Sequence, residues 1–196
     1  ERATGRAWTR DLARSAAGAA CLGRWLVRLH GLSPPPAMRR VDFVASLEHY
    51  VTELGGDAAT LELRQRARAA GVRLQRGASS VLCHNDLHHL NIIGSDGGVT
   101  VVDWEYAGLG DPVMDLAGFV AYHDLDEPAV AALLEAYGAG CAPPSAAGLA
   151  DARWLFEAVW WAWLELHRRL RPEEPAELRG ARQRLAARLE VGRAAG

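Results

Sequence analysis

The polar residues between positions 84 and 103 carry the groups that phosphoryl transfer requires. Asn91 follows Asp86 by five positions, and Asp103 follows Asn91 by twelve. A phosphoryl group in transfer passes through a loose transition state, so catalysis depends on placing the acceptor and neutralising charge with a metal ion. Carboxylate and amide oxygens are hard donors that suit Mg²⁺. These residue types therefore predict a carboxylate that handles the acceptor, next to a magnesium site.

The spacing of these residues is specific. His84-x-Asp86-x-x-x-x-Asn91 is the pattern of kinase catalytic loops, in which the Asp accepts the proton of the substrate hydroxyl and the Asn holds Mg²⁺. In this interpretation Asp86 is catalytic, Asn91 and Asp103 are metal ligands, and ATP and Mg²⁺ are the cofactors. His84 more often supports such a loop than carries a proton, so we expect its ring to hold the loop by hydrogen bonds.

The segments around the loop favour short strands. Residues 80–83 form an apolar run before it, and residues 92–93 and 99–102 flank a glycine-rich turn over 94–98. The last two segments should pair as an antiparallel hairpin, which brings the outer ends of both strands together. Asn91 and Asp103 would then share one metal site.

The rest of the sequence favours helices. Apolar positions at helical spacing, with Asp42 and Asp111 as start signals and Gly31 as a stop, mark most of them. The expected helices cover residues 8–32, 43–54, 61–74, 112–122, 127–138, 147–170 and 176–191. The predicted fold class is therefore α+β and mostly helical, with a small β-hairpin that carries the catalytic and metal residues.

Composition excludes several classes of protein. The formal net charge is −2, so no basic field for nucleic acid is present. Three widely spaced cysteines suggest neither a disulfide framework nor a zinc knuckle, and no apolar stretch reaches the length of a membrane span. We expect a cytoplasmic protein that acts on a small molecule, with no nucleic-acid or membrane partner. No sequence pattern indicates its oligomeric state.

The sequence resembles a known superfamily in two places. Residues 84–91 together with 103–117 look like the aminoglycoside phosphotransferase and choline kinase superfamily, and are closest to the bacterial choline, ethanolamine and thiamine kinases. Residues 22–30 also resemble the helix that these proteins carry just after the hinge. The resemblance implies the protein-kinase fold with a longer helical C-terminal lobe.

The resemblance also implies roles for individual residues. Asp86 would be the base, and Asn91 and Asp103 the magnesium ligands. Asp115 would tether the catalytic loop through its carboxylate, as structural support beside His84. Glu105 is a further candidate for a supporting role, because alternation along a strand would place it on the same side as Asp103.

The chain departs from the family at its N-terminal end. Its 22 basic residues are all Arg, so the lysine that pairs with ATP is missing. No strand-rich segment with a glycine loop precedes the first helix. We therefore expect residues 1–196 to be a kinase-like C-terminal lobe of an N-terminally incomplete sequence, without the lobe that covers the nucleotide and inactive by itself.

The tryptophans of the 147–170 helix bear on the substrate. Trp160 and Trp163 resemble the paired tryptophans, three apart, that line the choline pocket of choline kinases, and indole faces attract cationic nitrogen. We expect them, with Tyr106, to bind an alcohol related to choline, ethanolamine or thiamine. The alternative is a plain core stripe, because residues of this helix recur at spacings of three and four. That stripe comprises Phe156, Trp160, Trp163, Leu164 and His167.

Other functions remain open from the sequence. An aminoglycoside or other antibiotic phosphotransferase would use the same catalytic residues with a different acceptor. A zinc hydrolase could use Asp86 with His84, His88 and His89, although exposed or substrate-facing imidazoles are the more common interpretation of the last two. A kinase-like binding module without catalysis would explain the missing lysine.

Overall fold

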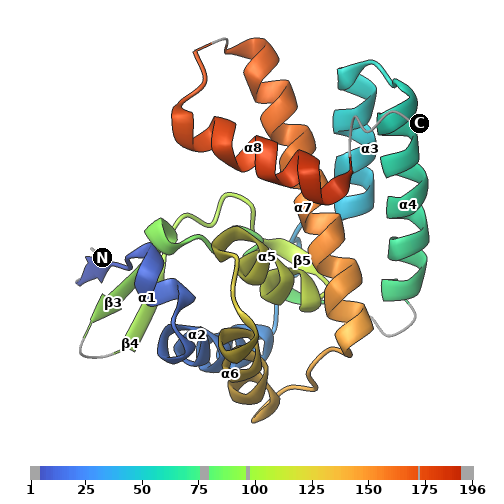
Figure 1. The fold of residues 1–196 in the computed structure, drawn as a ribbon. Coiled ribbons are helices and arrows are strands. Elements are labelled where there is room, and N and C mark those ends of the chain that lie inside the picture. Colours follow the sequence, from blue (N-terminus) through green and yellow to red (C-terminus); the bar gives the residue numbers. More distant parts are fainter. Residues whose placement is uncertain (1–4, 76–79, 96–97, 172, 191–196) are drawn as a thin grey trace. The chain divides into compact units, whose positions relative to one another are not determined.

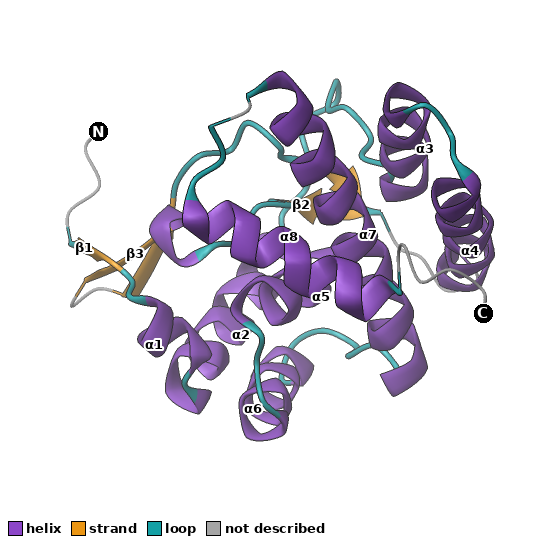
Figure 2. Ribbon diagram, turned by 45° about the horizontal axis from the view of Figure 1, so that its top comes forward, coloured by secondary structure: helices purple, strands orange, loops and turns teal. Residues whose placement is uncertain are grey.

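The computed structural model describes residues 5–75, 80–95, 98–171 and 173–190. The chain divides into two compact units. Unit 1 comprises residues 1–41 and 78–153, and unit 2 comprises residues 42–77 and 154–196. The described strands all belong to unit 1, and helices make up most of the described chain (Figures 1 and 2). The predicted fold class, mostly helical with a small β-hairpin, is confirmed.

Unit 1 carries the predicted hairpin. In it, β3 (Ile92–Ser95) pairs antiparallel with β4 (Gly98–Val101), and Ile92 lies opposite Val101. The short strand β1 (Arg6–Ala7) joins the outer side of β3, so the sheet order is β1-β3-β4. Residues 96 and 97 of the predicted turn lie outside the described residues. Asn91 comes directly before β3 and Asp103 two residues after β4, so both lie at the same end of the hairpin.

The predicted strand before the loop also forms, but with an unexpected partner. β2 (Val81–Cys83) pairs antiparallel with β5 (Gly108–Gly110), which the sequence pattern did not indicate. Leu109 exchanges backbone hydrogen bonds of 2.8 Å with the segment at Arg39 and Val41. A Cβ atom on Gly108 would lie 2.9 Å from the Arg39 carbonyl oxygen, so this close approach of two backbones requires glycine.

Three helices form the core of unit 1. They are α2 (Ala16–His30), α5 (Val113–His123) and α6 (Glu127–Gly138), and α2 runs beside α6 (Figure 1). Leu22, Phe119 and Leu133 are fully buried among them. Almost every residue of α5 is buried, as expected for a helix that is apolar on all sides. Polar side chains on α5 therefore stand out.

The first predicted helix, over residues 8–32, is wrong in its first part. The structure has a short helix α1 (Arg10–Arg14) and then α2, with Ser15 in extended conformation between them. The Ser15 hydroxyl accepts a hydrogen bond from the Gly18 N–H at 3.0 Å and donates to the Leu12 carbonyl at 2.8 Å. This side chain ends one helix and caps the next, which is why the chain does not form one continuous helix here despite its apolar periodicity.

Unit 2 consists of helices. It contains α3 (Phe43–Leu54), α4 (Ala58–Gln75), most of α7 (Ala146–Leu170) and α8 (Ala176–Leu189). Asp42 caps α3 as expected, because its carboxylate accepts the N–H groups of Val44 and Ala45. Arg182 of α8 bonds to Glu165 of α7 at 2.9 Å and to Glu174 at 3.0 Å, so ion pairs join the last two helices.

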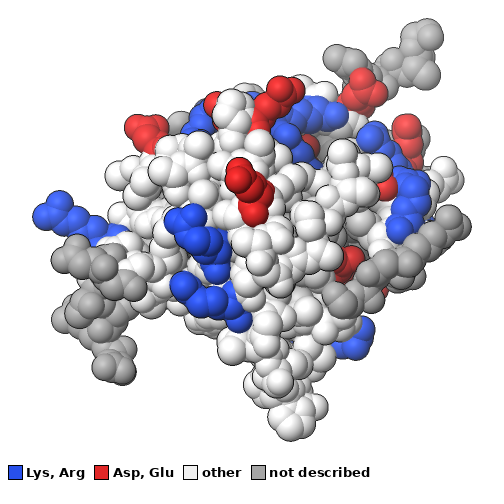
Figure 3. All heavy atoms as spheres, turned by 90° about the horizontal axis from the view of Figure 1, so that it is seen from below, with Lys and Arg blue, Asp and Glu red and all other residues white. Residues whose placement is uncertain are grey.

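None of the helices in the described ranges is long and apolar enough to cross a membrane. On the face drawn in Figure 3, basic and acidic side chains are interspersed with uncharged surface. Such a mixed surface agrees with the small net charge of the chain.

Candidate active site

His84 begins the catalytic-loop segment and is fully buried. Its Nδ1 lies 3.3 Å from the Asp86 backbone N–H, which donates to it, and its Nε2 lies 3.1 Å from the Val102 carbonyl oxygen. The neutral ring with its proton on Nε2 satisfies both contacts. Burial lowers the pKa of His84, which favours that neutral form. The ring thus links the loop to the residue before Asp103.

Asp115 holds the same loop from α5. Its Oδ2 accepts the backbone N–H of His84 at 2.9 Å, and its Oδ1 accepts that of Asn85 at 2.7 Å. Asn85 has a positive φ of 66°, in the left-handed region that few residue types adopt readily. The carboxylate therefore fixes a left-handed backbone turn, which Asn tolerates better than most residues, directly before Asp86.

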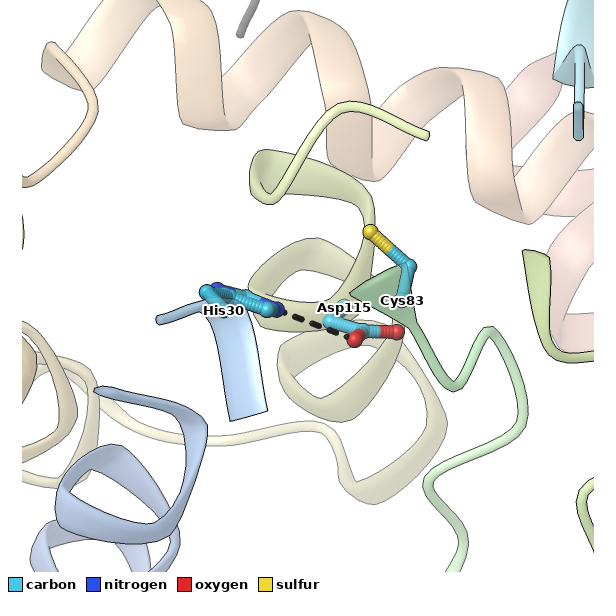
Figure 4. Close-up of side chains that lie close together, drawn as sticks. All are labelled: His30, Cys83 and Asp115. Carbon is cyan, nitrogen blue, oxygen red and sulfur yellow. Dashed lines mark hydrogen bonds and ion pairs between the residues drawn. The ribbon is translucent and has the colours of Figure 1, made fainter. Parts of the chain in front are cut away.

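A chain of buried groups continues behind Asp115 (Figure 4). His30, the last residue of α2, lies with Nε2 3.2 Å from Asp115 Oδ2, and its Nδ1 lies 2.9 Å from the Tyr137 hydroxyl. The imidazole therefore connects helices α2, α5 and α6. The sequence analysis did not identify His30 or Tyr137. A polar residue on an otherwise buried helix face is the signal that could have found His30.

The Cys83 thiol completes a cluster with His30 and Asp115. The three potential ligand atoms lie within 4.8 Å of one another, and this is the only such group of three or more His, Cys, Asp and Glu in the described part of the chain. Both carboxylate oxygens of Asp115 and both ring nitrogens of His30 already have hydrogen-bond partners. Burial strongly raises the pKa of the Cys83 thiol, which opposes the thiolate that metals bind. His30 and Asp115 are therefore best described as a hydrogen-bonded anchor for the loop, with the Cys83 thiol close by.

Asp86 projects from this anchored loop with a side chain that is 29% exposed. Asn91 Nδ2 donates to Asp86 Oδ2 at 2.9 Å and to the Asp86 carbonyl oxygen at 3.0 Å. His88 Nε2 lies 3.5 Å from the same Oδ2. Burial raises the pKa of the Asp86 carboxyl and the charge of Asp103 adds to this effect, while His88, His84 and Asn91 act against it.

The residues at the end of the hairpin fit a magnesium ion. Because both contacts of Asn91 Nδ2 go to Asp86, the amide has a fixed orientation, and no group of the described residues donates to its Oδ1. Asp103 is exposed, has a φ of 64°, and its carboxylate makes no hydrogen bond or ion pair with the residues described. The Val102 N–H donates to the Asn91 carbonyl at 2.9 Å, which ties the two segments together. An amide oxygen and a carboxylate remain available as hard donors.

A zinc hydrolase site was the alternative for these histidines, but His84 is not free to bind a metal ion. Both ring nitrogens of His84 are engaged within the loop, as described above, so this imidazole is not available to a metal. His88 stacks on Tyr122 with ring centroids 5.4 Å apart. A zinc site built on these histidines is therefore not supported.

Glu105 and Tyr106 both have exposed side chains, and each contacts another segment through its carbonyl oxygen. β4 ends at Val101, so strand alternation does not apply to Glu105, and that argument was wrong. The Glu105 side chain is exposed and its carbonyl oxygen accepts Arg39 Nη2 at 2.6 Å. Tyr106 is also exposed, and its carbonyl oxygen accepts Asn85 Nδ2 at 3.0 Å. Tyr106 thus contacts the catalytic loop through its backbone.

Trp160 and Trp163 belong to unit 2, and both are half-buried on α7. Trp160 lies 6.4 Å from the Phe156 ring, and Trp163 stacks on His167 at 4.9 Å, so one face of Trp163 is covered. The buried apolar positions of this stretch of helix are instead Leu155, Ala158, Trp161, Ala162 and Leu164. A plain core stripe accounts for Leu164 but not for the two half-buried indoles.

His123 is a second buried histidine that the sequence analysis missed. Its Nε2 accepts the backbone N–H of His89 at 3.1 Å, and its Nδ1 lies 3.0 Å from the Phe119 carbonyl oxygen, to which it donates. Burial lowers the pKa of His123 to about 3. A neutral imidazole therefore fixes the turn (His89–Asn91) that presents Asn91.

This arrangement predicts acid sensitivity. Because the pKa of His123 is near 6.5 when unfolded and about 3 when folded, stability is full above about pH 6.5 and falls as the pH is lowered through this window. The loss is about 2 kcal/mol by roughly pH 5. His123→Gln keeps a neutral acceptor, so its unfolding free energy, measured by urea titration at several pH values, should fall less steeply than that of the wild type. Parallel curves would contradict this account.

Comparison with known proteins gives partial sequence matches and a shared fold. Over 55 residues the chain is 42% identical to Protein LicA of Haemophilus influenzae, which covers 28% of this chain and 21% of that protein. A choline/ethanolamine kinase family protein from Mesorhizobium loti has a TM-score of 0.79 at 22% identity, over 97% of this chain and 69% of that one. Choline kinase LicA from Streptococcus pneumoniae has a TM-score of 0.74 at 20% identity, over 89% and 64%.

The match to H. influenzae Protein LicA thus spans about a fifth of that protein's length. A profile of the phosphotransferase enzyme family (APH) matches residues 1–155, which includes the loop, the hairpin and Asp115. With most of the chain covered by that profile, the protein belongs to the APH phosphotransferase enzyme family.

Proposed function

We propose that this chain is the C-terminal lobe of a protein that transfers the γ-phosphoryl group of ATP to an alcohol. The observation that carries the proposal is the orientation of the Asn91 amide. Its nitrogen is held by Asp86, so its oxygen is left for a metal ion at the end of the hairpin that also carries Asp103. The Asn91 side chain then connects the proposed base, Asp86, with the proposed metal site.

Each residue has a stated role in this proposal. Asp86 orients the acceptor hydroxyl and takes its proton as the oxygen attacks phosphorus. A magnesium ion on Asn91 and Asp103 would neutralise charge on the transferring phosphate oxygens. Asp115 and His84 act on the backbone only, by holding the loop in the conformation that presents Asp86.

The nucleotide-covering lobe is proposed to lie outside the present sequence. The solved relatives named above extend well beyond the part that this chain matches. The chain has no lysine, whereas ATP-binding kinase lobes place a lysine on the nucleotide phosphates. We therefore propose that residues 1–196 alone do not turn over ATP.

An alcohol with a cationic amine, related to choline or ethanolamine, is the proposed acceptor. Two observations support it: the half-buried indoles of Trp160 and Trp163, three residues apart on one helix face, and the choline and ethanolamine kinases among the relatives. Thiamine-like alcohols share the cationic nitrogen. An aminoglycoside would present several ammonium groups and instead favour a carboxylate-rich surface.

The catalytic assignment predicts the effect of Asp86→Ala in the full-length protein. Loss of the base should reduce kcat for phosphate transfer by about 10²–10⁴-fold, while the thermal unfolding midpoint stays close to that of the wild type. Exposed Asp11→Ala is the control and should retain activity. Wild-type turnover by Asp86→Ala would refute the assignment, and a wild-type protein without any kinase activity would favour the binding-module alternative.

The acceptor assignment predicts a different kinetic change. Trp160→Ala and Trp163→Ala should each raise KM for choline by roughly 2–30-fold, since one cation–π contact contributes about 0.5–2 kcal/mol, with a smaller change in kcat. Trp154→Ala is the control on the same helix, because Trp154 is already covered by Arg66 at 4.3 Å. Unchanged KM values for choline, ethanolamine and thiamine in both variants would exclude the two indoles from the substrate site.

A further inference from the structure

A stack of three side chains ends next to the proposed base. The Arg10 guanidinium of α1 lies over the Tyr122 ring of α5 at 5.8 Å, and Tyr122 stacks in turn on the His88 ring with an interplanar angle of 30°. Tyr122 of α5 thus packs against the His88 ring, and the His88 side chain stays 21% exposed. The phosphoryl transfer proposed above assigns no role to the His88 imidazole.

The two oxygens of Asp86 have different surroundings. Oδ2 accepts Asn91 Nδ2 at 2.9 Å and lies 3.5 Å from His88 Nε2, whereas Oδ1 receives no hydrogen bond from the described residues. A carboxylate with one oxygen held by the Asn91 donor and a second potential donor, His88, beside that oxygen has restricted rotation about its last bond. Its other oxygen then has a defined direction, which is what a base needs to meet an incoming hydroxyl.

We propose that His88 is a positioning residue for the phosphoryl transfer, whose Nε2–H holds Asp86 Oδ2 so that Oδ1 receives the substrate proton. This inference rests on the proposed kinase function. The separation of 3.5 Å is long for a hydrogen bond, as is common in catalytic sites without substrate, where such contacts shorten in the reactive complex.

The other ring nitrogen agrees with this arrangement. Nδ1 of His88 is buried and has no hydrogen-bond partner within the described residues. A proton on Nδ1 would be a buried donor without an acceptor, whereas a proton on Nε2 faces the carboxylate. The Nε2–H form is therefore the one that the surroundings favour. Stacking on Tyr122 then sets the direction in which that N–H points.

Two substitutions separate hydrogen bonding from packing in the full-length enzyme. His88→Phe keeps an aromatic ring for Tyr122 but has no donor, whereas His88→Gln keeps an N–H donor but no ring. We expect kcat of His88→Phe to fall by about 10–100-fold with KM for the alcohol nearly unchanged, and His88→Gln to recover much of the loss. The opposite order, with His88→Phe active and His88→Gln impaired, would show that only packing matters and overturn the proposal.

A second measurement on the 196-residue chain does not depend on turnover. In the ¹⁵N spectrum of histidine-labelled protein, with His88→Phe used to assign the signal, we expect a proton on Nε2 of His88. A bare Nε2 with the proton on Nδ1 would overturn the proposal. If the full-length wild type transfers no phosphate to any alcohol, the kinase function itself fails, and a bare or protonated Nε2 still decides whether His88 is the donor to Asp86.

Discussion

The site depends most on two hydrogen bonds, in which the Asp115 carboxylate accepts two successive backbone N–H groups. These belong to His84 and Asn85, and the second of them lies in a left-handed backbone conformation. Without the carboxylate, the buried His84 N–H would be left unsatisfied at a cost of about 1–3 kcal/mol, and the part-buried Asn85 N–H would lose its partner too. The direction in which Asp86 leaves the loop follows from this turn, and so does the contact of Asp86 with Asn91.

The helical core serves to keep that carboxylate in place. Asp115 is a nearly fully buried polar residue on a helix that is apolar on all sides, and its own support comes from His30 and Tyr137 on two other helices. Buried polar groups of this kind are stable only when every member has a partner. His123 is another buried polar residue of α5 with a partner in the loop, because its Nε2 accepts the His89 N–H. Two buried groups of α5 thus hold both ends of the segment from which Asp86 and Asn91 project.

Much of this was predictable because the relevant signals are local. The loop spacing, the cap at Asp42 and the antiparallel hairpin each depend on residues within a few positions of one another, whereas the N-cap of α5 is Pro112 and not the expected Asp111. Most of the features that were not predicted depend instead on residues far apart in the sequence. β5 pairs with β2 and approaches Arg39, both distant from it in sequence, and the contact of His30 with Tyr137 spans 107 positions. Ser15 is a further failure of a different kind, because one hydroxyl overrides an apolar periodicity that otherwise looks continuous.

The central claim is that Asn91 and Asp103 form a cation site at the open end of the hairpin. Paramagnetic broadening by Mn²⁺ in amide NMR spectra of the chain tests it most directly, because it detects even weak binding and locates the ion. The account predicts that signals of Asn91, Asp103 and their neighbours broaden first, and that Asn91→Ala and Asp103→Ala weaken the effect. Broadening centred on His30 and Cys83 instead, or an effect unchanged by both substitutions, would contradict it.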